Sequence, residues 1–220
     1  MAQKFYERYS RQELIKNWDQ SKLTNSRVVV IGDGFLSEFI NLALVALGIG
    51  EVRIVSHERI GKNDSSFLNK LKNGGYKGNE KAKVFSYALK NINPTIKIID
   101  INTKIFDKNY FVLFNNPDII IDSTDDITTK RLCADFCKEN NVDFIAASAG
   151  GLYGLVDINP DESKLNEHSA LEGQNQNKII SEILGGFVAD EVRKILMPLN
   201  NNEKVCKKTL RYSLKDNERF

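Results

Sequence analysis

Short runs of branched apolar residues alternate with longer amphipathic stretches through most of the chain. The short runs, at residues 27–31, 52–55, 96–101, 118–121 and 142–147, are typical of buried β-strands because they are nearly continuous and rich in valine and isoleucine. The stretches between them, at residues 35–47, 80–92 and 127–140, have the length and apolar spacing of helices. Strands that alternate with helices predict an α/β fold, a Rossmann-like doubly wound and mostly parallel sheet with helices on both faces.

The chain beyond Gly150 departs from this alternation. We expect a strand at residues 153–158, a polar loop at 159–177, a helix at 179–196 that ends before Pro198, and a last strand at 209–214. We expect these last strands to be antiparallel additions to the sheet.

The sequence contains no repeat, low-complexity tract or flexible linker, so one domain over residues 1–220 is the simplest partition. It would comprise an N-terminal helical segment at 1–26, a core at 27–158, a crossover loop at 159–177, and a C-terminal helix and strand at 178–220. A loop as long as this crossover is usually functional or disordered.

Composition and charge exclude several classes of protein. With 41% hydrophobic and 27% charged residues, the chain is not a disordered, collagen-like or disulfide-stabilised protein. Its 31 basic and 29 acidic side chains are mixed along the sequence, so we expect no nucleic-acid partner and no membrane partner. The longest apolar run, residues 39–50, is shorter than the ~20 residues of a membrane span. The N-terminus is too polar for a secretory signal.

The cysteines indicate the compartment. Cys133, Cys137 and Cys206 cannot form a paired disulfide framework, and their spacing is that of neither a zinc site nor a redox pair. We therefore expect a cytoplasmic protein in a reducing environment.

The first predicted strand runs into a glycine-rich turn, Gly32-Asp33-Gly34-Phe35-Leu36-Ser37. Glycines in such a turn let backbone N–H groups approach a phosphate at a helix N-terminus, and Ser37 is small enough for the third glycine position. By itself this motif is also compatible with a purely structural turn. An NAD site would require an acidic residue at the end of the second strand, where Ser56 stands, so the dinucleotide interpretation is disfavoured.

Four further motifs occur in order along the chain. They are Arg8-Tyr9-Ser10-Arg11-Gln12, Gly48-Ile49-Gly50, Gly78-Asn79-Glu80-Lys81 and Asp122-Ser123-Thr124-Asp125-Asp126. Together with the glycine turn, this ordered set resembles the E1-like superfamily of ThiF, MoeB and ubiquitin-activating enzymes. The resemblance covers roughly residues 8 to 158 and extends to the helix around 184–196.

The resemblance implies ATP-dependent adenylation of a carboxylate with release of pyrophosphate. On matching positions, Gly32 and Gly34 would bind the nucleotide, Lys81 would contact the phosphates, and Asp125 would hold Mg²⁺. Arg11 would reach the phosphates of the neighbouring subunit, so the resemblance also implies a homodimer with Arg11 acting in trans. Negative charge develops on the phosphates in this reaction, so fixed cations and a metal would supply most of the rate gain.

Single residues of this set have simpler explanations. Lys81 alone would be a solvated lysine at a helix start, and Asp125 alone would be a helix N-cap before Ile127. Arg8 and Arg11 alone would be surface cations paired with nearby glutamates.

The chain departs from the family pattern after the second predicted strand, where the family usually has an aspartate for the ribose. Ribose binding would then fall to Ser56 or Glu58.

A second departure concerns an arginine that faces the phosphates in the family. Phe67 or a neighbouring serine occupies that position, and Asp64 stands where an asparagine is expected. Lys62, Arg59 or Lys77 could replace the missing cation; otherwise the chain would be a weak or inactive homologue.

Many relatives transfer the acyl group to their own cysteine and carry structural zinc, but residues 159–177 contain no cysteine. We expect Cys133 and Cys137 to be buried small side chains, and Cys206 lies among lysines away from any family cysteine position. Adenylation without self-thioester formation and without zinc is therefore expected. We expect His168 to be a solvated loop histidine.

Three functions remain open, two of which differ in the carboxylate that is activated. The lysine-, asparagine- and isoleucine-rich, cysteine-poor sequence looks like the ThiF-like adenylyltransferases of iron-guanylylpyridinol cofactor biosynthesis (HcgE), whose substrate is a small-molecule carboxylate. The second possibility is activation of the C-terminal Gly-Gly tail of a sulfur-carrier or ubiquitin-like protein. The third is a non-catalytic subunit that lends Arg11 to an active partner.

Overall fold

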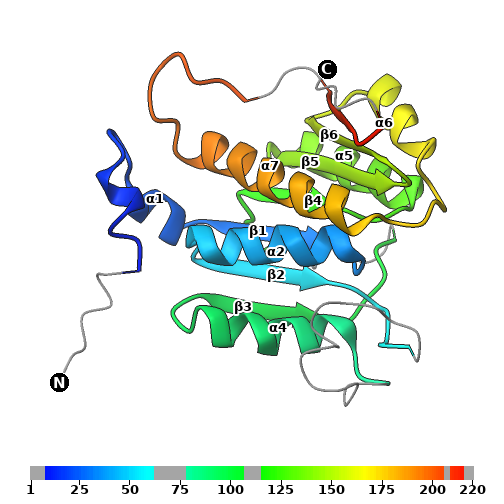
Figure 1. Cartoon of the computed structure of the whole chain (residues 1–220), viewed down its shortest axis with the longest axis horizontal. Coiled ribbons are helices and arrows are strands. Elements are labelled where there is room, and N and C mark those ends of the chain that lie inside the picture. Colours follow the sequence, from blue (N-terminus) through cyan, green and yellow to red (C-terminus); the bar gives the residue numbers. More distant parts are fainter. Residues whose placement is uncertain (1–7, 62–77, 107–114, 206–208, 216–220) are drawn as a thin grey trace.

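The computed structural model describes residues 8–61, 78–106, 115–205 and 209–215. Its centre is a seven-stranded sheet in the order β3-β2-β1-β4-β5-β6-β7 (Figure 1). The strands are β1 (Arg27–Ile31), β2 (Glu51–Val55), β3 (Lys97–Ile101), β4 (Ile119–Asp122), β5 (Asp143–Gly150), β6 (Tyr153–Ile158) and β7 (Leu210–Ser213).

The first five strands pair in parallel, β6 pairs antiparallel with β5, and β7 pairs antiparallel with β6. From β1 the chain adds β2 and then β3 on one side of β1. It then crosses back and adds β4 on the other side of β1, so the strand order reverses between β1 and β4. In open α/β sheets this reversal leaves a crevice at the carboxyl ends of the strands. The predicted Rossmann-like fold with antiparallel C-terminal strands is confirmed.

Helices cover both faces of the sheet, with α2, α4 and α7 on one face and α5 on the other (Figure 1). The helical elements are η2 (Gln12–Leu14), α1 (Gln20–Thr24), α2 (Phe35–Leu47), α4 (Lys81–Ile92), α5 (Ile127–Asn140), α6 (Glu162–Ser169) and α7 (Lys178–Leu196). No helix in the described part of the chain is both long and apolar enough to cross a bilayer.

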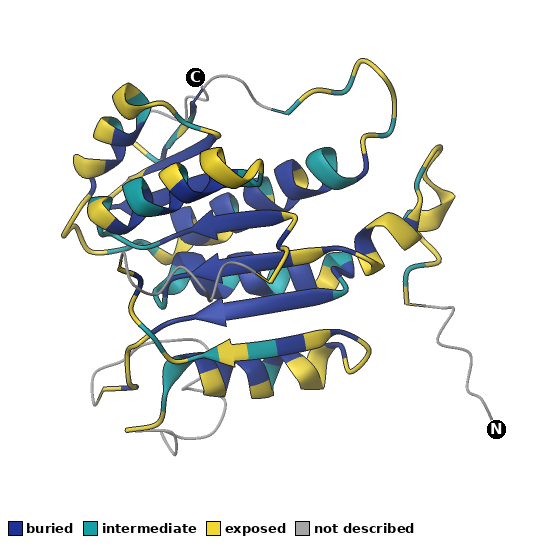
Figure 2. Cartoon of the chain, turned by 180° about the vertical axis from the view of Figure 1, so that it is seen from behind, coloured by how far each residue is buried: buried dark blue, intermediate teal, exposed yellow. Residues whose placement is uncertain are grey.

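The core consists of two apolar clusters, one on each face of the sheet. Val28 and Val30 of β1 pack with α2, α4 and α7, whereas Val29 and Ile31 pack with α5. Successive side chains of a strand point to opposite faces, so a strand that is buried on both sides must be apolar throughout. Figure 2 shows the central strands in the colour of buried residues.

The N-terminal segment packs against the C-terminal end of α2. Gly48 has a φ of 94°, and a side chain there would come within 2.7 Å of the Tyr9 ring. The Tyr9 hydroxyl accepts a hydrogen bond from Asn93 at 2.7 Å, and Gln12 donates to the carbonyl oxygen of Leu47 at 3.1 Å. The Arg-Tyr-x-Arg-Gln and Gly-Ile-Gly motifs are therefore two sides of one packing contact.

The predicted loop at residues 159–177 is partly wrong, because it contains helix α6. Asp161 caps this helix by accepting a hydrogen bond from the backbone of Lys164 at 3.0 Å. Leu165 and His168 form its buried face, and Leu165 belongs to the core cluster on the α5 side. The sequence there is mostly polar because only this narrow face is buried.

The prediction of a solvated His168 is also wrong, since the residue is only 3% exposed. Its Nδ1 lies 2.8 Å from the Ser148 hydroxyl and its Nε2 lies 3.2 Å from the Asp157 carboxylate. Burial lowers the pKa of His168, which favours the neutral ring. A neutral ring that donates from Nε2 to Asp157 and accepts at Nδ1 from Ser148 satisfies both contacts.

Candidate active site

A cleft of about 530 Å³ opens at the carboxyl ends of β1, β2 and β4, where the strand order reverses. Six predicted site residues line it: Gly32, Gly34, Ser56, Glu58, Lys81 and Asp125. Further residues of its wall, which were not predicted as site residues, are Asp33, Lys104, Thr124, Glu172 and Gln176.

The glycine turn joins the end of β1 to the start of α2. Gly32 has a φ of 137°, and a side chain there would collide with Ser123 at the end of β4. Ser37 occupies the third glycine position and is fully buried, and its hydroxyl donates to the carbonyl oxygen of Gly32 at 2.9 Å. The turn therefore presents the N-terminus of α2, where Gly34 is the N-cap, toward the cleft. Backbone N–H groups at such a terminus attract anions.

Lys81 is the first residue of α4, and its side chain is only 17% exposed. Its ammonium group lies 3.9 Å from the Asp33 carboxylate, which also lines the cleft. Its backbone nitrogen donates to the carbonyl oxygen of Glu58 at 2.9 Å, which fixes the start of α4 beside the segment that follows β2. Lys81 is thus a cation of the cleft and not a solvated lysine.

Asp125 is not the N-cap of α5. Asp126 has that role, because its carboxylate accepts from the backbone nitrogen of Thr128 at 2.8 Å. Burial raises the pKa of Asp125, and the hydrogen bond donated by Gln176 and the charge of Lys130 only partly offset this effect. A partly buried carboxylate that faces a cleft without an ion pair of its own among the described residues is a suitable ligand for Mg²⁺.

Lys130 anchors the segment between β4 and α5 that carries Asp125, and it was not identified from the sequence. Its side chain is 1% exposed, and the ammonium group donates to the Asp122 carboxylate at 3.1 Å and to the carbonyl oxygens of Thr124 at 2.7 Å and Ala147 at 3.1 Å. The helical spacing could have indicated that Lys130 is buried, because positions 130, 133 and 137 share one face of α5 and the two cysteines of that face are apolar.

Ser56 ends β2 and is buried. Its hydroxyl donates to the Asp33 carboxylate at 3.1 Å and accepts from the backbone nitrogen of Glu58 at 3.1 Å. The Glu58 side chain is half exposed and pairs with His57 at 3.4 Å. Asp33, His57 and Glu58 each offer one donor atom within 4.8 Å of one another, although the latter two are exposed.

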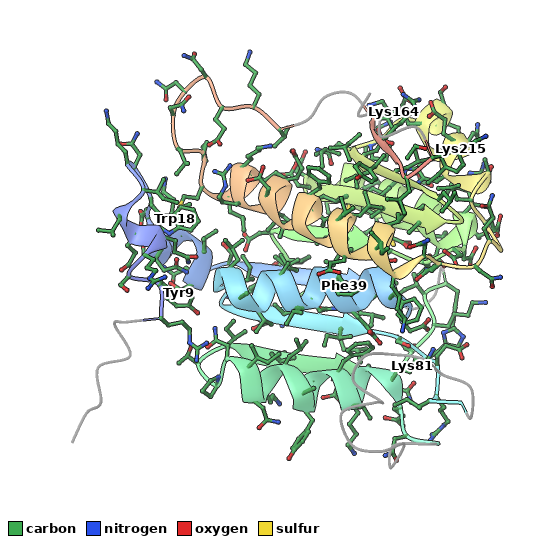
Figure 3. The ribbon with its side chains drawn as sticks, viewed as in Figure 1. Tyr9, Trp18, Phe39, Lys81, Lys164 and Lys215 are labelled. Atoms are coloured by element: carbon green, nitrogen blue, oxygen red, sulfur yellow. The ribbon has the colours of Figure 1, made fainter. Side chains whose placement is uncertain are left out.

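Arg11 does not reach the cleft of its own chain. It lies at the start of η2, against the C-terminal end of α2, whereas the cleft lies at the N-terminal end of that helix. Thirteen helical residues separate the two ends by about 20 Å, and Figure 3 shows Tyr9 and Lys81 correspondingly far apart. Arg8 donates to the carbonyl oxygen of Ile92 at 3.0 Å, but the exposed Arg11 has no hydrogen bond or ion pair with any described residue.

Of the three basic residues predicted to replace the missing arginine, only Arg59 lies within the described residues. Arg59 points away from the cleft, because it donates to the Gly78 carbonyl oxygen at 2.8 Å and pairs with Glu80 at 3.4 Å. Lys104 does line the cleft. The other positions considered, Lys62, Asp64, Phe67 and Lys77, lie outside the described residues.

Cys133 and Cys137 lie on the buried face of α5, as predicted. Burial raises the pKa of Cys133 well above its usual value and that of Cys137 to about 12. Thiols in this state are poor nucleophiles at neutral pH. Cys206 lies outside the described residues.

A sequence model of the ThiF family matches residues 6–220. The chain is 29% identical over 156 residues to the maize protein "Adenylyltransferase and sulfurtransferase MOCS3-1", covering 69% of this chain and 33% of the relative. It is 28% identical over 153 residues to "Sulfur carrier protein ThiS adenylyltransferase" of Bacillus subtilis, covering 68% and 46%. The chain thus spans a third to a half of the length of these relatives.

The fold is also that of solved structures. The E. coli MccB structure determined with ATP superposes with a TM-score of 0.76 at 17% identity, covering 97% of this chain and 70% of the other. At this identity the match concerns the fold alone.

Proposed function

Because the chain belongs to the ThiF family, we propose that it is an adenylyltransferase that uses ATP to activate a carboxylate. The observation that carries the proposal is the meeting of Lys81, Asp125 and the N-terminus of α2 in one cleft, from three motifs far apart in the sequence. Anion-binding amides, a cation and a metal-binding carboxylate are the groups that phosphoryl chemistry needs.

In the proposed reaction a substrate carboxylate oxygen attacks the α-phosphorus, and the bond from that phosphorus to the bridging oxygen breaks as pyrophosphate leaves. The amides at the start of α2 and the Lys81 ammonium group stabilise the charge that develops on the phosphate oxygens. Asp125 would hold Mg²⁺, which supplies further positive charge to the leaving pyrophosphate. Lys130 holds the segment that carries Asp125 in place through its hydrogen bonds to Asp122 and Thr124.

Arg11 is proposed to act in trans within a homodimer. Its exposed side chain and its position about 20 Å from the cleft of its own chain support this proposal, since an arginine anchored there is available only to another chain. The anchoring of Arg8, Tyr9 and Gln12 within the chain would hold Arg11 in a defined place.

Two substrates fit the proposal. A small-molecule carboxylate, such as the guanylylpyridinol precursor activated by HcgE-type enzymes, is our first choice on composition. The names of the relatives support the alternative, the C-terminal tail of a sulfur-carrier protein. In either case we propose that no self-thioester forms and no zinc is required, because the two described cysteines are buried with raised pKa values.

A non-catalytic binding subunit is the competing function, and one assay separates the two. Pyrophosphate exchange into ATP, measured with a panel of small acids and a Gly-Gly carrier tail, should be stimulated by the substrate. Calorimetry should show ATP binding and no comparable NAD binding. Binding of ATP without exchange for any acid would favour the non-catalytic subunit, and tight NAD binding without ATP binding would overturn the proposal.

A further inference from the structure

The residue directly after β2 is not acidic, although nucleotide-binding sheets usually place an acidic residue there for the ribose. Ser56 stands at this position, and its hydroxyl is already used twice, as a donor to Asp33 and as an acceptor from the backbone of Glu58. The hydroxyl proton of Ser56 is therefore not free for a ligand.

Asp33 brings a carboxylate to the same place from the neighbouring strand. Ile31 and Val55 are register partners in the parallel pair β1–β2, so the residues that follow them emerge side by side at one edge of the sheet. The carboxylate of Asp33 reaches across to Ser56 at 3.1 Å and remains 29% exposed in the wall of the cleft. The glycine turn thus places the Asp33 carboxylate beside Ser56, where an acidic residue at the end of β2 would otherwise stand.

We propose that Asp33 is the ribose-binding residue of this cleft, with Ser56 positioning its carboxylate; this inference rests on the proposed binding of ATP. A carboxylate has about four acceptor sites, and Ser56 uses one of them. The remaining sites accept the hydroxyl protons of a vicinal diol. Hydrogen bonds to a charged acceptor are stronger than those between neutral groups, so this pair discriminates between ribonucleotides and deoxyribonucleotides.

Two other roles compete for this position. Glu58 is also acidic, but its side chain is half exposed and paired with His57, at the rim of the site. Asp33 could alternatively serve only as a counter-ion for Lys81, 3.9 Å away. In that case its removal would take away one counter-ion of the lysine and would not affect recognition of the sugar.

The test is calorimetric binding of ATP, 2′-deoxy-ATP and 3′-deoxy-ATP, each with Mg²⁺, to the wild type and to Asp33→Ala, Asp33→Asn, Ser56→Ala and Glu58→Gln. We expect the wild type to bind ATP roughly 10- to 100-fold more tightly than at least one deoxy analogue. Asp33→Ala should lose this preference, Asp33→Asn and Ser56→Ala should reduce it, and Glu58→Gln should retain it. Thermal melting of each variant checks that it is folded.

The outcomes separate the inference from the function on which it rests. If the wild type binds no ATP, the proposed function fails. If ATP binds but Asp33→Ala keeps the full preference, the ribose assignment is wrong. Loss of the preference in Glu58→Gln assigns the ribose to Glu58, and tighter ATP binding by Asp33→Ala with an unchanged preference assigns Asp33 as a counter-ion.

Discussion

The side-chain amide of Gln176 donates a hydrogen bond to the Asp125 carboxylate at 3.3 Å. Its amide oxygen accepts from the backbone nitrogen of Leu36 at 3.4 Å, in the first turn of α2. One neutral side chain thus occupies both the donor that a phosphate would use and the carboxylate that a metal would use.

Replacing Gln176 should therefore favour the nucleotide. In Gln176→Ala, Mg²⁺ and a phosphate no longer compete with two hydrogen bonds of about 0.5–1.5 kcal/mol each, so ATP should bind roughly 5- to 150-fold more tightly by calorimetry. Gln174→Ala is the matched control, because that exposed amide donates to the Ala170 carbonyl oxygen instead. Weaker ATP binding by Gln176→Ala would show that the amide contacts the nucleotide.

Lys81 and Asp125 should each be required for pyrophosphate exchange. Lys81→Ala and Asp125→Ala remove one charge-stabilising contact each, and we expect losses of at least ~100-fold in the exchange rate. The exposed Lys83 lies on α4 with Lys81, and the exposed Asp135 lies on α5, the helix that follows Asp125, so both serve as matched alanine controls. Unchanged turnover in both site variants would reject the cleft as the active site.

Arg11 can be tested by mixing two inactive proteins. Arg11→Ala and Asp125→Ala should each be nearly inactive, but their mixed dimer has one intact site, so exchange of subunits should restore up to about a quarter of wild-type activity by the logic of an arginine supplied in trans. Lys16→Ala, an exposed cation of the same segment, should behave like the wild type. If proven subunit exchange restores no activity, Arg11 does not act across the dimer.

His168 should make the folded state sensitive to mild acid. Its pKa is lowered in the folded protein, so the unfolded chain takes up the proton first and stability is lost as pH falls below about 6.5. The loss is at most about 1.4 kcal/mol per pH unit in urea denaturation. His168→Gln should flatten the slope between pH 7 and 5.5, and the exposed His57→Gln serves as the comparison variant. Equal slopes in all three proteins would contradict the assignment.

The Asp157 carboxylate should contribute in a lower pH range. Burial alone would raise its pKa, but hydrogen bonds from His168 and Thr209 outweigh this effect and lower it. Its stabilising contribution is present above about pH 3.8 and is lost only below that value. The slope between pH 7 and 5.5 therefore reports on the histidine.

Lys130 should be needed for stability. Lys130→Met leaves the buried Asp122 carboxylate without its cation, which should cost about 3–5 kcal/mol in urea denaturation. The additional change Asp122→Asn removes that charge and should recover most of the loss. Lys138→Met, on the exposed side of α5, is the control. A double variant no more stable than Lys130→Met would mean that the uncompensated charge is not the cause.

The strands and long helices could be predicted from the sequence because their apolar periodicity is strong. The strand at residues 27–31 has the predicted bounds, and helices α2 and α5 also begin and end at the predicted residues. Helix α6 could not be predicted, because a single buried leucine and a buried histidine do not make a recognisable apolar face.

The site shows the same division between local and long-range information. Gly32, Lys81 and Asp125 belong to motifs whose spacing can be recognised along the chain. Asp33 and Gln176 acquire their places from contacts across 23 and 140 residues, with Ser56 and Leu36 respectively. No local pattern encodes such pairs, so they were found only in the folded structure.

The separation of Arg11 from the cleft by the length of α2 has a consequence for assembly. Two chains that exchange Arg11 reciprocally are related by a two-fold axis, so that each contact is made twice. Such an arrangement closes on itself and leaves no free end for a third chain. Dilution would then remove the arginine from both clefts at once, and the specific activity of the protein would depend on its own concentration.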